Sequence, residues 1–434
     1  MAALYSTRST AAGYPAVVRY NRTAAWTFDL ARSTAYTRQG DPALAGVERD
    51  GESLIRTTDV FYGNVDLQRI GIPHADVQMR LLTRLVTTLL ADVQPTPRLW
   101  YFPGTARTLM VTTGDSHTST LASYTALLQA AESYGARMSL YLSRFITLPA
   151  VDVTAWRDAG HELGLHPYFT PDGQTVPQGY AANAASFVQD VAPLYGPTVR
   201  HHAVEWQGWI DPVAVMPGYG IRMDLSYYSW GPTMYAPDVL NQAHGYMTGS
   251  ALPMKFVDAA GVVQPVYQQS TALIDEQLVT GPDSQLLDTP TALAVSRQLI
   301  DNSQAGGYSA IGAQFHVDYY EYGEVGPWVD GTMAYAQSLG VPMWNAERWL
   351  RYVEARAATT ITGVNWNAGS SQLAFSMAVP AGAEAQSLLV PRTYDGQVVS
   401  AVTIDGQPTI ITPFTVSGQA MRAILVAPLG GAGR

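Results

Sequence analysis

Aspartate and histidine residues end several short apolar runs in the middle of this sequence. They are Asp115 and His117 in TTGDSH, His166 in HELGLHP, His201 and His202 in VRHHA, and His316 in QFHVD. Imidazoles and a carboxylate are a suitable ligand set for a catalytic divalent ion such as Zn²⁺, with one position left open for water. Such an ion polarises a carbonyl and lowers the pKa of its water to about 7. A single histidine at a strand end is more often a hydrogen-bonded scaffold residue, but several such strand ends favour a metal site.

The apolar runs that carry these residues alternate with amphipathic helices from about residue 105 onward. Strands are expected at residues 108–113, 138–142, 162–165, 199–204, 221–225, 310–316 and 341–344. The alternation predicts a parallel β/α architecture that closes, or nearly closes, into a barrel. The carboxyl ends of parallel barrel strands open on one face, so we expect the distant Asp and His residues to converge there. Residues 231–285 lack a clear pattern and are interpreted as an insertion.

Two further parts flank this barrel. We expect an N-terminal α/β segment over residues 1–100, which resembles an incomplete domain, the barrel over 101–357, and a C-terminal β-sandwich over 358–434. In the last part, apolar residues alternate with small or polar ones, and DG pairs at 395–396 and 405–406 indicate hairpin turns. The incomplete first part leads us to expect more native sequence upstream, including an export signal.

Composition excludes several classes of function. The chain has 25 Lys and Arg against 35 Asp and Glu, a net charge of −10, and it contains no cysteine. The negative charge opposes binding to nucleic acid, and any metal must be held by His, Asp or Glu. No apolar run approaches the length of about 18 residues that a membrane span needs. The glycine-rich nucleotide motifs and the GxSxG serine-hydrolase motif are also missing.

The order of the motifs TGDSH, GHELGLHP, VRHHAVEW and QFHVD resembles the motif series of the polysaccharide deacetylases, the NodB-type carbohydrate esterases. The resemblance covers residues 105–356 and implies a distorted (β/α) barrel, here with flanking β-rich domains. It also implies a metal-dependent hydrolase. By position, Asp115 matches the catalytic base, His166 the first metal histidine, Arg200 the motif arginine, and His316 the late catalytic acid.

The sequence departs from the family pattern at two positions. Ser116 stands where the family has a second Asp, which binds the metal, and Thr170 stands where it has a second metal His. We therefore expect Asp115, His166 and His202 to hold a divalent metal, with zinc as the expected ion. His117 is then a fourth ligand or a base that compensates for Ser116.

Aromatic residues follow the same strand ends. Trp206, Tyr228, Trp230 and Tyr319 are the expected substrate-binding residues, because the C–H faces of sugar rings pack well on flat aromatic rings; packing in the core is the equal alternative. Asp224 is expected to orient a neighbouring His or Arg, with a surface or helix-cap role left open.

Together these features predict a metal-dependent deacetylase of an extracellular or cell-surface polysaccharide or oligosaccharide. Metal-activated water would hydrolyse N- or O-acetyl groups, Asp115 or His117 would take a proton, and His316 would protonate the leaving group. One alternative is a catalytically impaired carbohydrate-binding or matrix protein. Another is a glycoside hydrolase, which the scarcity of acidic residues at strand ends disfavours.

Overall fold

The computed structural model describes residues 2–5, 11–49, 51, 53–65, 69–230, 245–281 and 284–428. The chain forms two compact units. The first comprises residues 1–29, 78–107 and 351–434, and the second comprises residues 30–77 and 108–350. The second unit thus contains residues 108–350 of the predicted barrel together with residues 30–77 of the predicted N-terminal segment.

A curled ten-stranded sheet forms the second unit. Its strands are β5 (Leu109–Ser116), β6 (Ser139–Leu142), β7 (Glu162–Leu165), β8 (Thr198–Val199), β9 (Met223–Asp224), β10 (Met254–Val257), β11 (Val263–Gln268), β12 (Thr271–Ile274), β13 (Ala310–Gln314) and β14 (Met343–Trp344). The order is β10-β11-β9-β8-β7-β6-β5-β13-β12, with β14 also paired to β5. Only β10 and β11 pair antiparallel among these strands. The backbone N–H of Thr271 in β12 donates to Tyr227 O after β9, so the sheet curls into a distorted barrel as predicted.

Most strands of this sheet are buried on both faces, which explains their nearly continuous apolar runs; β10 and the first half of β11 are partly exposed. All eight residues of β5 are buried. Gly114 lies where a Cβ would clash with the carbonyl oxygen of Phe315, so the absence of a side chain lets β5 and the end of β13 approach closely. This contact lies next to Asp115.

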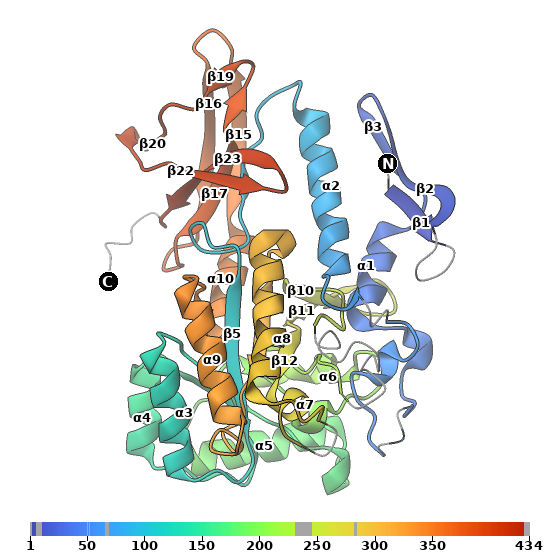
Figure 1. Ribbon diagram of the computed structural model, residues 1–434, viewed down its shortest axis with the longest axis vertical. Coiled ribbons are helices and arrows are strands. Elements are labelled where there is room, and N and C mark those ends of the chain that lie inside the picture. Colours follow the sequence, from blue (N-terminus) through green and yellow to red (C-terminus); the bar gives the residue numbers. More distant parts are fainter. Residues whose placement is uncertain are drawn as a thin grey trace. The chain divides into compact units, whose positions relative to one another are not determined.

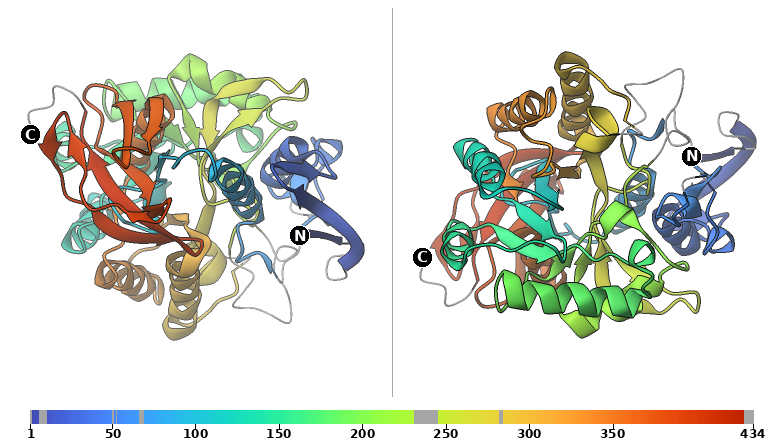
Figure 2. Two further views of the ribbon diagram at one scale, coloured as in Figure 1. Left: turned by 90° about the horizontal axis from the view of Figure 1, so that it is seen from above. Right: turned by 90° about the horizontal axis from the view of Figure 1, so that it is seen from below.

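Helices cover the outside of the sheet (Figure 2). They include α3 (Leu121–Ser133), α4 (Ala150–Asp158), α5 (Val176–Asp190), α6 (Asp211–Val215), α7 (Asp275–Leu278), α8 (Thr289–Asn302) and α9 (Val325–Ser338). Helices α8 and α9 pack side by side (Figure 1). Asp288 caps α8 by accepting from the N–H of Thr291, and Pro290 follows in its first turn. Three further helices are α1 (Leu30–Gln39), α2 (His74–Leu90) and α10 (Ala346–Ala358).

Two expectations about the barrel are corrected. The strand expected over residues 199–204 ends at Val199, and His202 begins the 3₁₀ turn η5 (His202–Val204), in which Ala203 and Val204 have positive φ angles of 50° and 47°. Residues 231–244 lie outside the described part, but the rest of the expected insertion contains β10, β11, β12 and α7. The short runs of four to six residues in these strands gave no clear periodicity.

The first unit is rich in antiparallel β-structure. Its sheets contain β1 (Ala2–Tyr5), β2 (Ala11–Tyr20) and β3 (Thr23–Trp26); β4 (Arg98–Leu99), β17 (Gln386–Pro391), β22 (Thr412–Val416) and β23 (Gln419–Val426); and the pairs β15 (Thr360–Asn367) with β16 (Gln372–Ala378), β18 (Thr393–Tyr394) with β19 (Gln397–Val398), and β20 (Thr403–Ile404) with β21 (Gln407–Pro408). Both DG pairs have positive φ and form the predicted hairpin turns.

Among the described residues, no helix combines the length and the hydropathy that are needed to cross a bilayer.

Candidate metal centre

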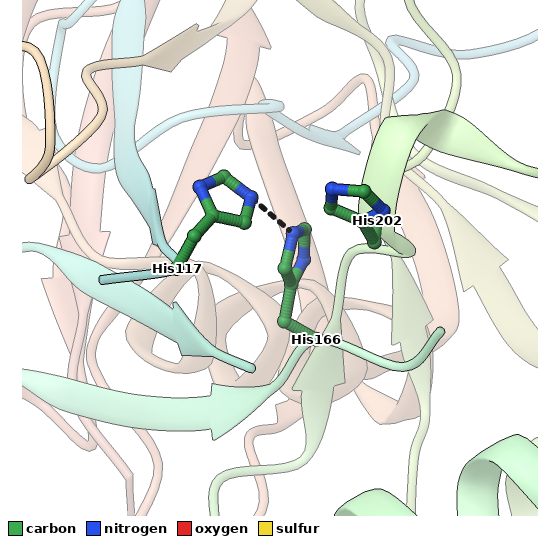
Figure 3. A group of neighbouring side chains, drawn as sticks. All are labelled: His117, His166 and His202. Carbon is green, nitrogen blue, oxygen red and sulfur yellow. Dashed lines mark hydrogen bonds between the residues drawn. The ribbon is translucent and has the colours of Figure 1, made fainter. Parts of the chain in front are cut away.

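Three histidines converge at the carboxyl ends of the barrel strands (Figure 3). His117 follows β5, His166 follows β7, and His202 follows β8. One ring nitrogen of each lies within 4.8 Å of the corresponding nitrogens of the other two. The Nε2 atoms of His117 and His166 are 3.2 Å apart. Two imidazole nitrogens bound to one tetrahedral Zn²⁺ at about 2.0–2.1 Å lie roughly 3.4 Å apart, so this spacing suits a shared ion.

Asp318 holds His117 in place. Its Oδ2 accepts from the backbone N–H of His117 at 2.9 Å and from the ring Nδ1 at 2.7 Å. Burial opposes the charge on this carboxylate, but hydrogen bonds from His117 and Ser119 hold the pKa of Asp318 well below its usual range. Asp318 is therefore ionised, and Nδ1 of His117 carries the proton that it donates.

Hydrogen bonds hold both the backbone and the ring of His166. Its N–H donates to the side-chain oxygen of Asn183 at 2.9 Å, and its Nδ1 lies 2.9 Å from the carbonyl oxygen of Arg200. A carbonyl oxygen only accepts, so Nδ1 carries the proton. Burial lowers the pKa of His166 well below its usual value, and the charge of His117 lowers it further. The ring is neutral, and its Nε2 lone pair faces His117.

This arrangement of donors fits a cation. The Nε2 atoms of His117 and His166 face each other at hydrogen-bond distance, 3.2 Å. Because Nδ1 of each ring donates to an acceptor, Nε2 is the atom of each ring that a cation would engage. Neutral imidazoles are also the form in which histidine binds metals.

His202 completes the group from the opposite side. Its ring stacks on Tyr168, with ring centroids 3.8 Å apart and planes inclined by 11°. Burial, together with the neighbouring His166 and His117, lowers the pKa of His202 to about 2, so it too is neutral. The preceding residue, His201, donates its backbone N–H to Ser226 Oγ, and Ser226 Oγ in turn donates to Asp224. Asp224 thus holds Ser226, which in turn accepts from the residue that precedes His202.

Asp115 is close to this group but is engaged elsewhere. Its Oδ1 accepts from Arg200 Nη1 at 3.0 Å and its Oδ2 from the amide of Gln314 at 2.8 Å, while Oδ2 is 3.9 Å from His166 Nε2. The structure therefore groups His117, rather than the expected Asp115, with His166 and His202. Strand β5 turns Asp115 into the barrel, where the fully buried Arg200 spans the interior.

The two family positions that differ in this chain lie away from the histidine group. The hydroxyl of Ser116 bonds with the hydroxyl of Tyr124 at 2.5 Å, on the side of α3. Thr170 donates to Glu205. Neither side chain replaces the missing metal ligand of the family, whereas His117 lies in a suitable position to do so.

His316 forms a second cluster beside Asp115. Its Nδ1 is 2.6 Å from Asp275 Oδ1, its Nε2 is 4.0 Å from Asp115 Oδ2, and its Nε2 is 3.7 Å from Glu276 Oε2. Burial alone would lower the pKa of His316, but the charges of Asp275 and Glu276 raise it to about 10. His316 is thus protonated at neutral pH and faces the same region as Asp115.

Reasoning from the sequence missed Asp275 and Glu276. Both follow the apolar residues Ala272, Leu273 and Ile274 of β12, so a signal was present: acidic residues at a strand end. It was overlooked because this segment was interpreted as part of an insertion.

The expected substrate-binding aromatics occupy different environments. Trp206 is fully buried, and its Nε1 donates to Trp209 O, so a substrate could reach its ring only if the core opened. Tyr228 is also buried and donates to Glu276 Oε1 at 2.8 Å. Trp230 and Tyr319 are partly exposed. The Tyr319 ring lies 4.8 Å from that of His316, which places it beside the second cluster.

No protein-family sequence model matches the chain, and a search of curated protein sequences finds no match. Similar solved structures do exist. One is a protein of Mycobacterium smegmatis provisionally described as a polysaccharide deacetylase, with 14% identity and a TM-score of 0.45 over 63% of this chain and 100% of that chain. Another is Puue allantoinase, with 13% identity and a TM-score of 0.43 over 59% of this chain and 93% of that chain.

A third is the peptidoglycan deacetylase PdaC of Bacillus subtilis, with 10% identity and a TM-score of 0.35 over 58% of this chain and 93% of that chain. These solved structures are similar to this chain in their fold, at TM-scores of 0.35 to 0.45. At these identities the likeness concerns the fold alone, and the roles of individual residues depend on the geometry of this chain.

Proposed function

We propose that this protein is a metal-dependent hydrolase that removes N- or O-acetyl groups from a polysaccharide or oligosaccharide. The observation that carries the proposal is the convergence of His117, His166 and His202, in which Nδ1 of His117 and of His166 is bound to an acceptor and Nε2 of each faces the group. These residues would hold a divalent ion, with zinc proposed because three neutral imidazoles are a known catalytic zinc set. We propose an acetylated carbohydrate as the substrate because the sequence motifs resemble those of polysaccharide deacetylases. We also propose that the protein acts outside the cell or at its surface.

The ion, when bound, would supply a Lewis acid for the acetyl carbonyl and a water of lowered pKa. The remaining chemistry belongs to side chains. Asp115 lies within 4.0 Å of both His166 Nε2 and His316 Nε2, between the metal ligands and the second cluster. Held by Arg200 and Gln314, its carboxylate is placed to accept the proton of the attacking water.

His316 would act as the acid. It is protonated at neutral pH because of its carboxylate neighbours, and Asp275 fixes the ring through Nδ1 so that Nε2 presents the proton. The polar atoms around Nε2 are the side-chain amide of Gln314 at 2.9 Å, Glu276 Oε2 at 3.7 Å and Asp115 Oδ2 at 4.0 Å, so the proton donor and the acceptor Asp115 lie close together. The proton passes from Nε2 to the nitrogen or oxygen that leaves as the acetyl–heteroatom bond breaks.

Metal content and acetate release test the proposal together. We expect purified protein to contain about one zinc per chain and to release acetate from an acetylated chitooligosaccharide. His166→Ala should abolish both, whereas His74→Gln, a change at a partly buried histidine that begins α2, should affect neither. Full metal retention by His166→Ala would contradict the ligand assignment. Binding of sugar with metal present but without acetate release would instead indicate an impaired, carbohydrate-binding protein.

A further inference from the structure

A pocket of about 360 Å³ lies in the β-rich first unit, formed by β22, β23 and two neighbouring segments. Three arginines line it. Arg422 lies in β23, Arg392 directly follows β17, and Arg107 comes from the segment after β4. Among the described lining residues none is acidic, in a chain whose net charge is −10.

The backbone fixes where these arginines lie. The N–H of Arg392 donates to Ala420 O at 3.0 Å, which holds Arg392 beside β23. The guanidinium of Arg107 donates to Thr415 O at 3.1 Å and lies over the ring of Phe414, 5.4 Å from its centroid. Arg107 is therefore oriented by the β22–β23 hairpin, so its charge has a defined position at the pocket.

Two of the guanidinium groups lack a counter-charge. Within the described part of the chain, neither Arg392 nor Arg422 forms an ion pair. The Nε–H of Arg422 is in addition buried and has no hydrogen-bond partner among the described residues. Like charges repel, and an unsatisfied buried donor is unfavourable. Both penalties are relieved when an anion with oxygen acceptors enters.

We propose that this pocket binds an oxyanion: a carboxylate, or a sulfate or phosphate group, carried by a small molecule or by one residue of a glycan. Guanidinium groups match such groups with paired N–H donors. The volume is within the range of pockets that bind small ligands. Phe414 and Met421 contribute an apolar wall that suits a ring attached to the anionic group. The site lies in the unit that lacks the histidine group, and the proposal does not depend on the hydrolytic function.

Calorimetric titration of the full chain tests the proposal. The probes are sodium glucuronate and sodium sulfate, with glucose as the neutral partner of glucuronate. We expect saturable binding of at least one anion, weakened by added sodium chloride, and no binding of glucose at the same concentrations. Glucuronate binding would indicate that the ligand carries a carboxylate, as a uronic acid does. Binding of sulfate alone would indicate a sulfate or phosphate group, either as an ester or as the free ion.

Substitutions locate the binding. Arg422→Gln and Arg392→Gln should each weaken anion binding at least tenfold. Arg19→Gln, at an exposed arginine of β2 in the same unit, removes the same charge and should change the affinity less than twofold. Arg392 is exposed, so its variant remains a test if Arg422→Gln does not fold. The proposal is overturned if neither anion binds, if glucose binds as well as glucuronate, or if Arg392→Gln and Arg19→Gln behave alike.

Discussion

The Nε2 atoms of His117 and His166 lie 3.2 Å apart, although 49 residues separate the two histidines in the sequence. Each ring donates its Nδ1 proton to an acceptor on the far side, a carboxylate for His117 and a carbonyl for His166. The protein thus turns both Nε2 atoms toward one point. Such preorganisation favours metal binding because the rings need little rearrangement.

Asp318→Asn is expected to weaken zinc binding by about 10- to 100-fold, because the amide no longer fixes the proton on Nδ1 of His117. Competition with a chromophoric chelator measures the affinity. Asp330→Asn is the matched control, since Asp330 accepts from Tyr320 rather than from a metal ligand. Equal affinities in the two variants would show that Asp318 does not orient His117.

Asp275→Asn is expected to shift the alkaline limit of activity to lower pH. In the wild type the pKa of His316 is raised to about 10, so the acid is protonated below that pH and activity is lost as the pH rises through it. Removing one carboxylate lowers that pKa. A pH profile of kcat for acetate release measures the shift. Asp301→Asn, which changes a partner of Tyr335, is the control; identical pH profiles of the wild type and Asp275→Asn would show that Asp275 does not set the pKa of the acid.

Arg200→Met is expected to destabilise the protein by about 3–5 kcal/mol, because it leaves the buried carboxylate of Asp115 without its cationic partner. Urea unfolding measures the loss. The exposed Arg297→Met should cost far less. If the charge of Asp115 is the cause, adding Asp115→Asn to Arg200→Met should recover part of the stability. No recovery would point to lost packing instead.

Asp224→Asn is expected to flatten the pH dependence of stability between about pH 4 and pH 7. Burial raises the pKa of Asp224 to about 7, against hydrogen bonds from Ser226, whereas an unfolded aspartate titrates near 4. The folded state therefore binds a proton at Asp224 more tightly than the unfolded state does. The contribution of this proton to the free energy of unfolding is fully present below about pH 4 and is lost as the pH rises through about 7, by at most about 4 kcal/mol.

Urea unfolding at pH 5 and pH 8 compares the wild type with Asp224→Asn, and the partly exposed Asp152→Asn serves as the control. If the wild type and Asp224→Asn lose the same stability between these two pH values, Asp224 is ionised in the folded protein at both.

The convergence of His166, His202 and His316 could be predicted from the sequence. Short buried runs alternating with helices indicate parallel strands, and parallel strands place their carboxyl ends on one face. This argument needs only the order of the elements. It holds even though the strand near His202 is shorter than predicted and ends at Val199.

The choice between Asp115 and His117 could not be predicted. Both are close to the end of β5, and either residue type binds zinc. The interior arginine, Arg200, takes one oxygen of Asp115, and Gln314 takes the other. His117 lies beyond the last residue of the strand, where the chain turns toward Asp318 and presents the ring to His166.

The sequence by itself determined a β/α barrel, β-rich flanking parts and a face where histidines gather, because these follow from local periodicity and strand direction. Only the tertiary structure decided the partners that set each proton, Asp318 for His117 and Asp275 for His316. These pairs are 201 and 41 residues apart in the chain. Hydrogen-bond partners at such separations depend on the paths of loops and on side-chain packing, and no local pattern encodes either.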